Sequence, residues 1–90
     1  MTRREIHVKK VIDGDTFKDD KGKKYRLENV DAPEKKETGY QKAKKQLTNL
    51  IEDENVSIQQ VARDKYGRPI VRVYEGRESV NKKMQEKLKK

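Results

Sequence analysis

Three short segments of this chain hold five ionisable side chains whose types could act together in one reaction. Residues 11–16 have the sequence VIDGDT and contribute Asp15. Residues 25–34 have the sequence YRLENVDAPE and contribute Arg26, Asp31 and Glu34. Residues 64–68 have the sequence DKYGR and contribute Arg68. Carboxylates for a divalent ion, a further carboxylate for a water and guanidiniums for a phosphate are the groups of a metal-dependent phosphodiesterase.

The chemistry of phosphodiester cleavage gives each of these side chains a role. The phosphodiester is an anion, and a hard dication held by the carboxylates of Asp15 and Asp31 offsets its charge. Glu34 is expected to act as the general base, or as the acceptor that orients the attacking water. Arg26 and Arg68 can each donate two parallel hydrogen bonds to phosphate oxygens, and they keep their charge near neutral pH.

Each segment taken alone also has an ordinary structural interpretation. Asp13-Gly14-Asp15 is typical of a turn, and Arg26 on a strand is typical of a solvated charge. Glu34 after a proline is compatible with an ordinary loop acid, and residues 64–68 with a hairpin turn closed by a salt bridge. The joint occurrence of all three segments favours the catalytic interpretation.

Strand and turn patterns place the first two segments on neighbouring strands. Residues 6–17 carry apolar side chains at strand spacing, and residues 25–27 are typical of a returning strand. Between them, the sequence DDKG at residues 19–22 predicts a turn. Pro33 breaks the chain after Asp31 and predicts a loop.

A helix is predicted to follow this loop. Thr38 is expected as its N-cap, with Gln41 completing a capping box. Residues 53–55 are expected to end it. Its apolar face at helical spacing consists of Tyr40, Ala43, Leu47, Leu50 and Ile51.

The second half of the chain predicts a hairpin and a second helix. Residues 56–61 and 70–74 are expected as strands joined by the turn at residues 64–68. Apolar residues at positions 80, 84 and 88 predict a helix, with Ser79 as its cap. The order βββαββα favours a mainly β fold with helices (α+β), a five-stranded OB-type barrel formed as a single domain over residues 1–90.

Composition limits the classes of function. The chain has 90 residues, 30% hydrophobic and 44% charged, so we expect a thin core. Its net charge of +8 favours a polyanionic partner, most simply nucleic acid, although a Lys-rich solvated surface is the alternative. The absence of Cys excludes disulfides and thiolate metal sites. No apolar run approaches membrane-spanning length and no signal peptide is visible, so a cytoplasmic protein and a processed secreted form both stay open.

With these motifs, the chain resembles the thermonuclease family, the staphylococcal nuclease-like domains. The matching stretches are residues 11–16, 26–34 and 64–68, with Val80-Asn81 a weaker fourth. Gly39 and Ala43 lie where the family opens its first helix. The resemblance covers residues 8–84 and implies a five-stranded OB-type barrel with helices. It also implies calcium-dependent hydrolysis of DNA and RNA, leaving 3′-phosphates.

The resemblance also implies roles for individual residues. Arg26, Glu34 and Arg68 match the family's catalytic triad. Asp15 and Asp31 match the family's calcium carboxylates. Ala32 matches a position whose backbone carbonyl binds the metal. Lys65 and Tyr66 match two positions along the bound nucleotide.

The chain departs from the family pattern at two places. It lacks the family's third C-terminal helix, together with the tyrosines that line the nucleotide pocket there, and the loop after Glu34 is short. These departures are expected to affect stability, affinity and base preference, but they remove no reacting group.

The leading hypothesis is a calcium-dependent, monomeric endonuclease of little sequence specificity, with Mg²⁺ as the alternative metal. Single-stranded DNA and RNA are its favoured substrates, and no membrane is involved. The alternative is a non-catalytic OB-type module that binds single-stranded nucleic acid. A protein-interaction domain is a third interpretation, but the sequence offers no apolar patch in its support.

Overall fold

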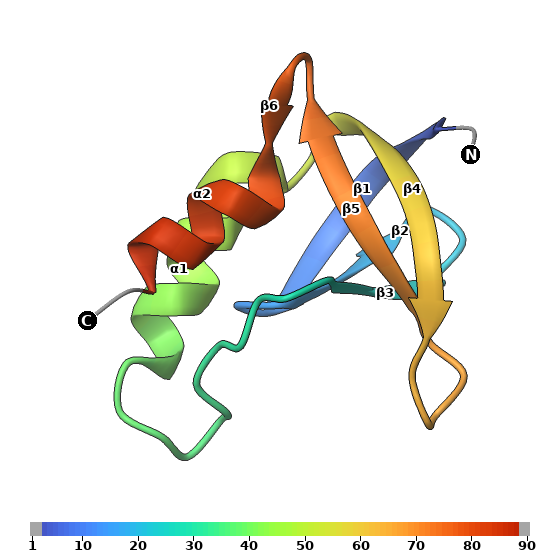
Figure 1. Ribbon diagram of the computed structural model, residues 1–90. Coiled ribbons are helices and arrows are strands. Elements are labelled where there is room, and N and C mark those ends of the chain that lie inside the picture. Colours follow the sequence, from blue (N-terminus) through green and yellow to red (C-terminus); the bar gives the residue numbers. More distant parts are fainter. Residues whose placement is uncertain (1–2, 89–90) are drawn as a thin grey trace.

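The computed structural model describes residues 3–88. Two helices and six strands lie within this part of the chain (Figure 1). In chain order they are β1 (Arg4–Asp13), β2 (Thr16–Asp19), β3 (Lys24–Leu27), α1 (Tyr40–Ile51), β4 (Asn55–Arg63), β5 (Pro69–Glu75), β6 (Glu78–Ser79) and α2 (Val80–Lys87).

Five of the strands close into a barrel. The sheet has the order β3-β2-β1-β4-β5, and its consecutive neighbours pair antiparallel. A short parallel seam between β3 and β5 closes it, where Arg26 pairs with Ile70 and Leu27 with Val71. This confirms the predicted OB-type α+β fold. The two-residue strand β6, which pairs with the end of β5, adds to the predicted order.

Alternating side chains of the strands fill the barrel, and both helices pack on one side of it (Figure 1). Leu47 and Ile51 of α1 and Val80 and Met84 of α2 join the same buried cluster. The predicted apolar face of α1 is confirmed, since four of its five residues are buried and Leu50 is partly buried against the core. The helices therefore supply part of the apolar surface that a barrel of short strands lacks.

One of the two predicted helix caps is confirmed and the other is wrong. The Ser79 hydroxyl accepts a hydrogen bond from the Lys82 amide, so Ser79 caps α2 as expected. The predicted Thr38 cap of α1 is wrong, because Gly39 occupies the N-cap position with φ of 88°. Entry into the helix through this left-handed conformation suits glycine. It leaves the exposed Thr38 outside the cap position.

Strand β4 contains an irregularity that the sequence did not predict. Its pairing with β5 shifts register between Gln60 and Ala62, and Val61 at the shift is only half-buried. A bulge bends the strand. This bend lies just before the turn that carries Arg68.

No helix within residues 3–88 has the length and apolar character needed to cross a membrane.

Candidate active site

Five predicted site side chains line one open pocket of about 450 Å³. Four parts of the chain form its walls: the β1–β2 turn with the strand ends beside it, strand β3, the loop that follows β3, and the β4–β5 turn. The convergence that the sequence hypothesis requires is therefore present. The residues lining the pocket are Asp13, Asp15, Thr16, Arg26, Asp31, Ala32, Pro33, Glu34, Lys35 and Arg68.

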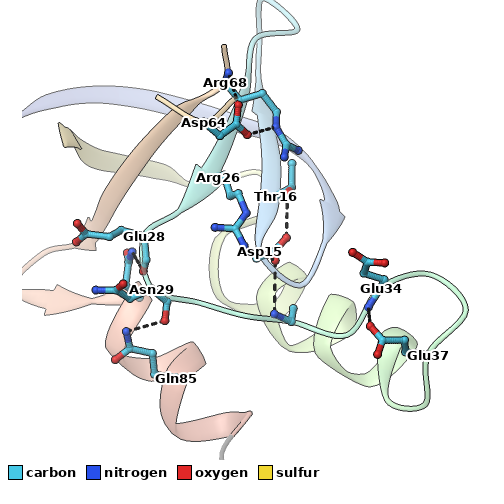
Figure 2. Close-up of polar contacts among 12 residues, drawn as sticks. Asp15, Thr16, Arg26, Glu28, Asn29, Glu34, Glu37, Asp64, Arg68 and Gln85 are labelled. Atoms are coloured by element: carbon cyan, nitrogen blue, oxygen red, sulfur yellow. Dashed lines mark hydrogen bonds and ion pairs between the residues drawn. The ribbon is translucent and has the colours of Figure 1, made fainter. Parts of the chain in front are cut away.

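Asp15 lies at the centre of this arrangement (Figure 2). Its Oδ1 accepts a hydrogen bond of 2.9 Å from the Thr16 hydroxyl, and its Oδ2 lies 3.5 Å from the Ala32 amide nitrogen. Arg26 Nη2 lies 3.6 Å from the same Oδ2. The backbone carbonyl of Asp15 accepts a hydrogen bond from the Leu27 amide. Asp15 thus connects its own turn to β3 and to the loop that carries Asp31 and Glu34.

Gly14 allows these segments to meet. A Cβ atom at this position would lie 2.8 Å from the Ala43 Cβ and 2.9 Å from the Ala32 Cβ. Carbon atoms in favourable contact are about 3.5–4.0 Å apart. Only glycine therefore lets the Asp15 turn approach α1 and the loop this closely.

A second contact fixes the same turn to α1. The Tyr40 hydroxyl donates to Asp13 Oδ1 at 2.7 Å and also lies 3.1 Å from the Ile12 carbonyl. The hydrogen bond to Asp13, with burial as a smaller cause, raises the pKa of Tyr40. The sequence predicts Tyr40 only as an apolar residue of the helix. Its hydroxyl contact with Asp13 joins residues 27 positions apart, so no local pattern predicts it.

Arg68 is held by its own turn. Its Nε donates to Asp64 Oδ2 at 2.6 Å, and its backbone amide donates to Asp64 Oδ1 at 2.9 Å. The Tyr66 amide also donates to this Oδ1. Partial burial raises the pKa of Asp64, but the hydrogen bonds and charge of Arg68 and the Tyr66 amide outweigh it and lower the pKa overall. Asp64 is thus a carboxylate that orients Arg68, a role that sequence reasoning had reduced to a turn salt bridge.

Arg26 is held less tightly. It lies on β3 between Thr16 of β2 and Ile70 of β5, and its side chain is half-buried. Its ion pair with Asp15 spans 3.6 Å. Figure 2 shows the Arg26 side chain beside Asp15, with Arg68 extending from above toward the same region. Two guanidinium groups therefore face one space, Arg26 from strand β3 and Arg68 from the β4–β5 turn.

Glu34 and Asp31 are both exposed on the loop between β3 and α1. Ala32 between them is buried. The Glu34 amide donates to Glu37 Oε1 at 2.7 Å, and the Glu37 amide donates to the Glu34 carbonyl at 2.8 Å. Sequence reasoning gave Glu37 no part in the site.

The buried side-chain amide of Asn81, on α2, holds the start of the loop between β3 and α1. Asn81 Oδ1 accepts from the Val73 amide at 2.8 Å, and Nδ2 donates to the carbonyls of Glu28 and Val71, each at 3.0 Å. These bonds join the end of β3 to β5, next to the short seam that closes the barrel. Asn81 belonged to the weaker fourth match, which indicated its importance without indicating its contacts.

The donor set near Asp15 fits a hard cation. The side chains of Asp15 and Asp31 and the backbone carbonyl of Ala32 offer oxygen ligands, and an ionised carboxylate has room for several donors or a cation. Within residues 3–88, no group of three or more His, Cys, Asp or Glu side chains is arranged to hold a metal. A site made by these residues would therefore be weak and would need oxygens from water and substrate.

Lys65 and Tyr66 lie on the turn beside Arg68 and do not line the pocket. The Tyr66 ring is 73% exposed. Lys65 Nζ and Arg68 Cζ lie 5.2 Å and 5.7 Å from the centre of this ring. The turn thus presents an accessible aromatic ring with two cationic side chains near it.

Comparison with known proteins agrees with this geometry. Residues 24–87 match the family described as staphylococcal nuclease homologue. A protein named uncharacterized endonuclease from Haemophilus influenzae is 38% identical over 81 residues, which are 86% of this chain and 46% of that protein. A protein of the same name from Escherichia coli O157:H7 is 36% identical over 75 residues, 78% of this chain and 49% of that protein.

This chain spans about half the length of the curated relatives it matches. The family match itself covers most of the chain and includes the segments with Arg26, Glu34 and Arg68. The chain therefore belongs to the staphylococcal nuclease homologue family.

Proposed function

We propose that this protein is a metal-dependent endonuclease that hydrolyses phosphodiester bonds of DNA and RNA with little sequence specificity. The observation that carries the proposal is the gathering of Asp15, Arg26, Asp31, Glu34 and Arg68 around one pocket. A purely binding surface has no need of two acids and a third carboxylate beside paired guanidiniums. Family membership supports the same reaction class.

Arg26 and Arg68 bind the scissile phosphate in this proposal. The Asp64 contact uses only the Nε–H of Arg68, and a guanidinium has five N–H donors. Its remaining donors are available to phosphate oxygens. Arg26 has one ion pair of 3.6 Å with Asp15, which a closer phosphate oxygen can replace. Both groups stabilise the negative charge that builds up in the transition state.

Glu34 accepts a proton from the attacking water. Glu34 is exposed and lines the same pocket as Arg26 and Arg68, so a water between Glu34 and the phosphate is accessible from solvent. General base catalysis of this kind contributes typically about 100- to 10,000-fold in rate.

Asp15, Asp31 and the backbone carbonyl of Ala32 would hold the metal, for which we propose Ca²⁺ with Mg²⁺ as the alternative. When bound, the dication supplies positive charge against the phosphate and orients a non-bridging oxygen. Because these residues make a weak site, metal and substrate should strengthen one another's binding.

Lys65 and Tyr66 contact the nucleotide next to the scissile bond in this proposal. The exposed Tyr66 ring can stack on any base, since every base has a π face. Phosphate contacts carry no sequence information, and stacking favours unpaired strands. We therefore propose single-stranded DNA and RNA as preferred substrates.

The test is cleavage of an end-labelled single-stranded oligonucleotide in Ca²⁺, in Mg²⁺ and in a chelator. We expect fragments ending in 3′-phosphates in Ca²⁺, and no fragments with the chelator. Retained strand binding without cleavage in millimolar Ca²⁺ or Mg²⁺ would instead indicate the non-catalytic binding module. Cleavage that the chelator does not change would contradict the metal requirement.

A further inference from the structure

The loop that carries Glu34 is exposed, so its shape depends on specific contacts. Glu34 and Glu37 are joined by two hydrogen bonds, drawn in part in Figure 2. The Glu37 amide donates to the Glu34 carbonyl at 2.8 Å, which closes a four-residue turn. The Glu34 amide donates to Glu37 Oε1 at 2.7 Å, which closes the same turn from its other side. The second bond depends on the Glu37 side chain.

This turn is connected to the rest of the site at both ends. Toward the N-terminus, the Ala32 amide nitrogen lies 3.5 Å from Asp15 Oδ2. Toward the C-terminus, the Tyr40 amide donates to the Glu37 carbonyl at 3.3 Å. The Tyr40 hydroxyl in turn donates to Asp13. Contacts therefore run around the pocket from Asp15 through the loop and α1 back to the β1–β2 turn.

The two glutamates of the turn have different environments. Glu34 lines the pocket with the arginines, whereas Glu37 lines a neighbouring hollow with Lys36 and Thr38. Because the Glu37 carboxylate is bonded to a backbone amide, it stays on the loop. A free loop of this length would leave Glu34 many positions, because its backbone keeps its conformational freedom until specific contacts fix it.

We propose that Glu37 is a positioning residue for Glu34, an inference that rests on the proposed function. Its carboxylate oxygen holds the Glu34 amide and thereby aims the Glu34 carboxylate into the pocket. Glu37 itself touches neither substrate nor metal. Its effect should fall on the rate of the bound complex, because the arginines and the metal-binding oxygens lie outside the turn.

Two substitutions separate the acceptor from the charge. Glu37→Ala removes both, whereas Glu37→Gln keeps an Oε1 acceptor and removes the charge. Glu86→Ala on α2 is the matched control, because this exposed acid lies outside the pocket. We expect Glu37→Ala to lower kcat about 10- to 100-fold, as for other misplaced catalytic groups, with KM changed less than about twofold. Glu37→Gln should stay within about threefold of the unaltered protein, and Glu86→Ala should match it.

Amide hydrogen exchange of Glu34 in the metal-free protein gives a readout independent of activity. We expect exchange about tenfold faster in Glu37→Ala than in the unaltered protein, and unchanged in Glu37→Gln. If the unaltered protein cleaves and Glu37→Ala has the same kcat, the positioning role of Glu37 is overturned while the proposed function stands. Equal losses of kcat in Glu37→Ala and Glu37→Gln also overturn this role, because they assign the effect to charge. An unaltered protein that cleaves no strand overturns the proposed function, and this inference with it.

Discussion

The two arginines of the pocket are held by different means, and this difference determines what each substitution should do. Arg68 is anchored through Nε to Asp64 at 2.6 Å, while Arg26 makes an ion pair of 3.6 Å with Asp15. Because the guanidinium is planar and rigid, the bond at Nε also fixes the direction of its remaining N–H groups. Arg68 is therefore the better preorganised phosphate ligand, and it depends on a fork that lysine lacks.

Arg68→Lys should lower the single-turnover cleavage rate about 100- to 1,000-fold, because a point charge replaces a bidentate donor. The melting temperature should change little, since the side chain is partly exposed. Arg72→Lys is a suitable control, because Arg72 lies on β5, four residues after Arg68, but pairs with Glu28 outside the pocket. Equal rates for Arg68→Lys and Arg72→Lys would remove Arg68 from the reaction.

The Asp64 carboxylate should keep Arg68 oriented well into the acidic range. Its folded-state pKa is below the ordinary 3.8, so its stabilising contribution is fully present above that value and is lost as pH falls through the folded pKa. The amides of Tyr66 and Arg68, which both donate to Asp64 Oδ1, report this directly. Their NMR shifts should stay constant from about pH 7 to pH 5 and move only at lower pH. A transition above pH 5 would contradict the assigned contacts.

At the scale of elements, the site depends on close packing between the β1–β2 turn, the β3–α1 loop and α1. Gly14 is the point where all three meet. Glycine is needed here because the Ala32 and Ala43 side chains leave no room for a Cβ atom, and not because the backbone adopts a left-handed conformation.

Gly14→Ala should therefore affect both stability and the metal site. The added methyl group would lie within 3 Å of two others, and overpacking of this kind costs about 1–3 kcal/mol. We expect a lower melting temperature and weaker Ca²⁺ binding by calorimetry, because Asp15 must move with its turn. A variant with an unchanged melting temperature and Ca²⁺ isotherm would show that the close approach is dispensable.

Local patterns were sufficient to predict most of the elements. Period-two and helical spacing predicted the strand regions and both helices, and the Ser79 cap followed from residue type alone. Residues 6–17, expected as one extended run, instead divide at the turn after Asp13 into β1 and β2. The Thr38 cap failed because Gly39 takes a left-handed conformation, which competes with the capping box one residue away. The bulge at Val61 has no marker such as glycine in the sequence.

Contacts between distant segments explain what the sequence could not predict of the site. The motifs predicted which side chains share the pocket, and their chemical roles stay predictions. Asn81, Tyr40 and Glu37 position the reacting segments through bonds to backbone groups or to residues far along the chain. Such bonds depend on geometry that no local pattern specifies.

The whole molecule carries a net charge of +8 on 90 residues, which sets its interaction with polyanions. Binding of single-stranded DNA should release counterions, with a slope of log K against log salt near −0.7 for each phosphate neutralised. Contact with about four phosphates predicts a loss of affinity of about 50-fold between 50 and 200 mM salt. Fluorescence anisotropy with a chelator present measures this without cleavage. An affinity independent of salt would exclude the phosphate backbone as the main contact.

The most direct measurement is single-turnover cleavage of a single-stranded oligonucleotide by Glu34→Gln in saturating Ca²⁺, together with its affinity for the strand. Loss of the base should lower the rate at least about 100-fold, while the dissociation constant stays within about threefold, because the arginines and metal-binding oxygens remain. Cleavage by Glu34→Gln at the rate of the unaltered protein would contradict the assignment of this pocket as a hydrolytic active site.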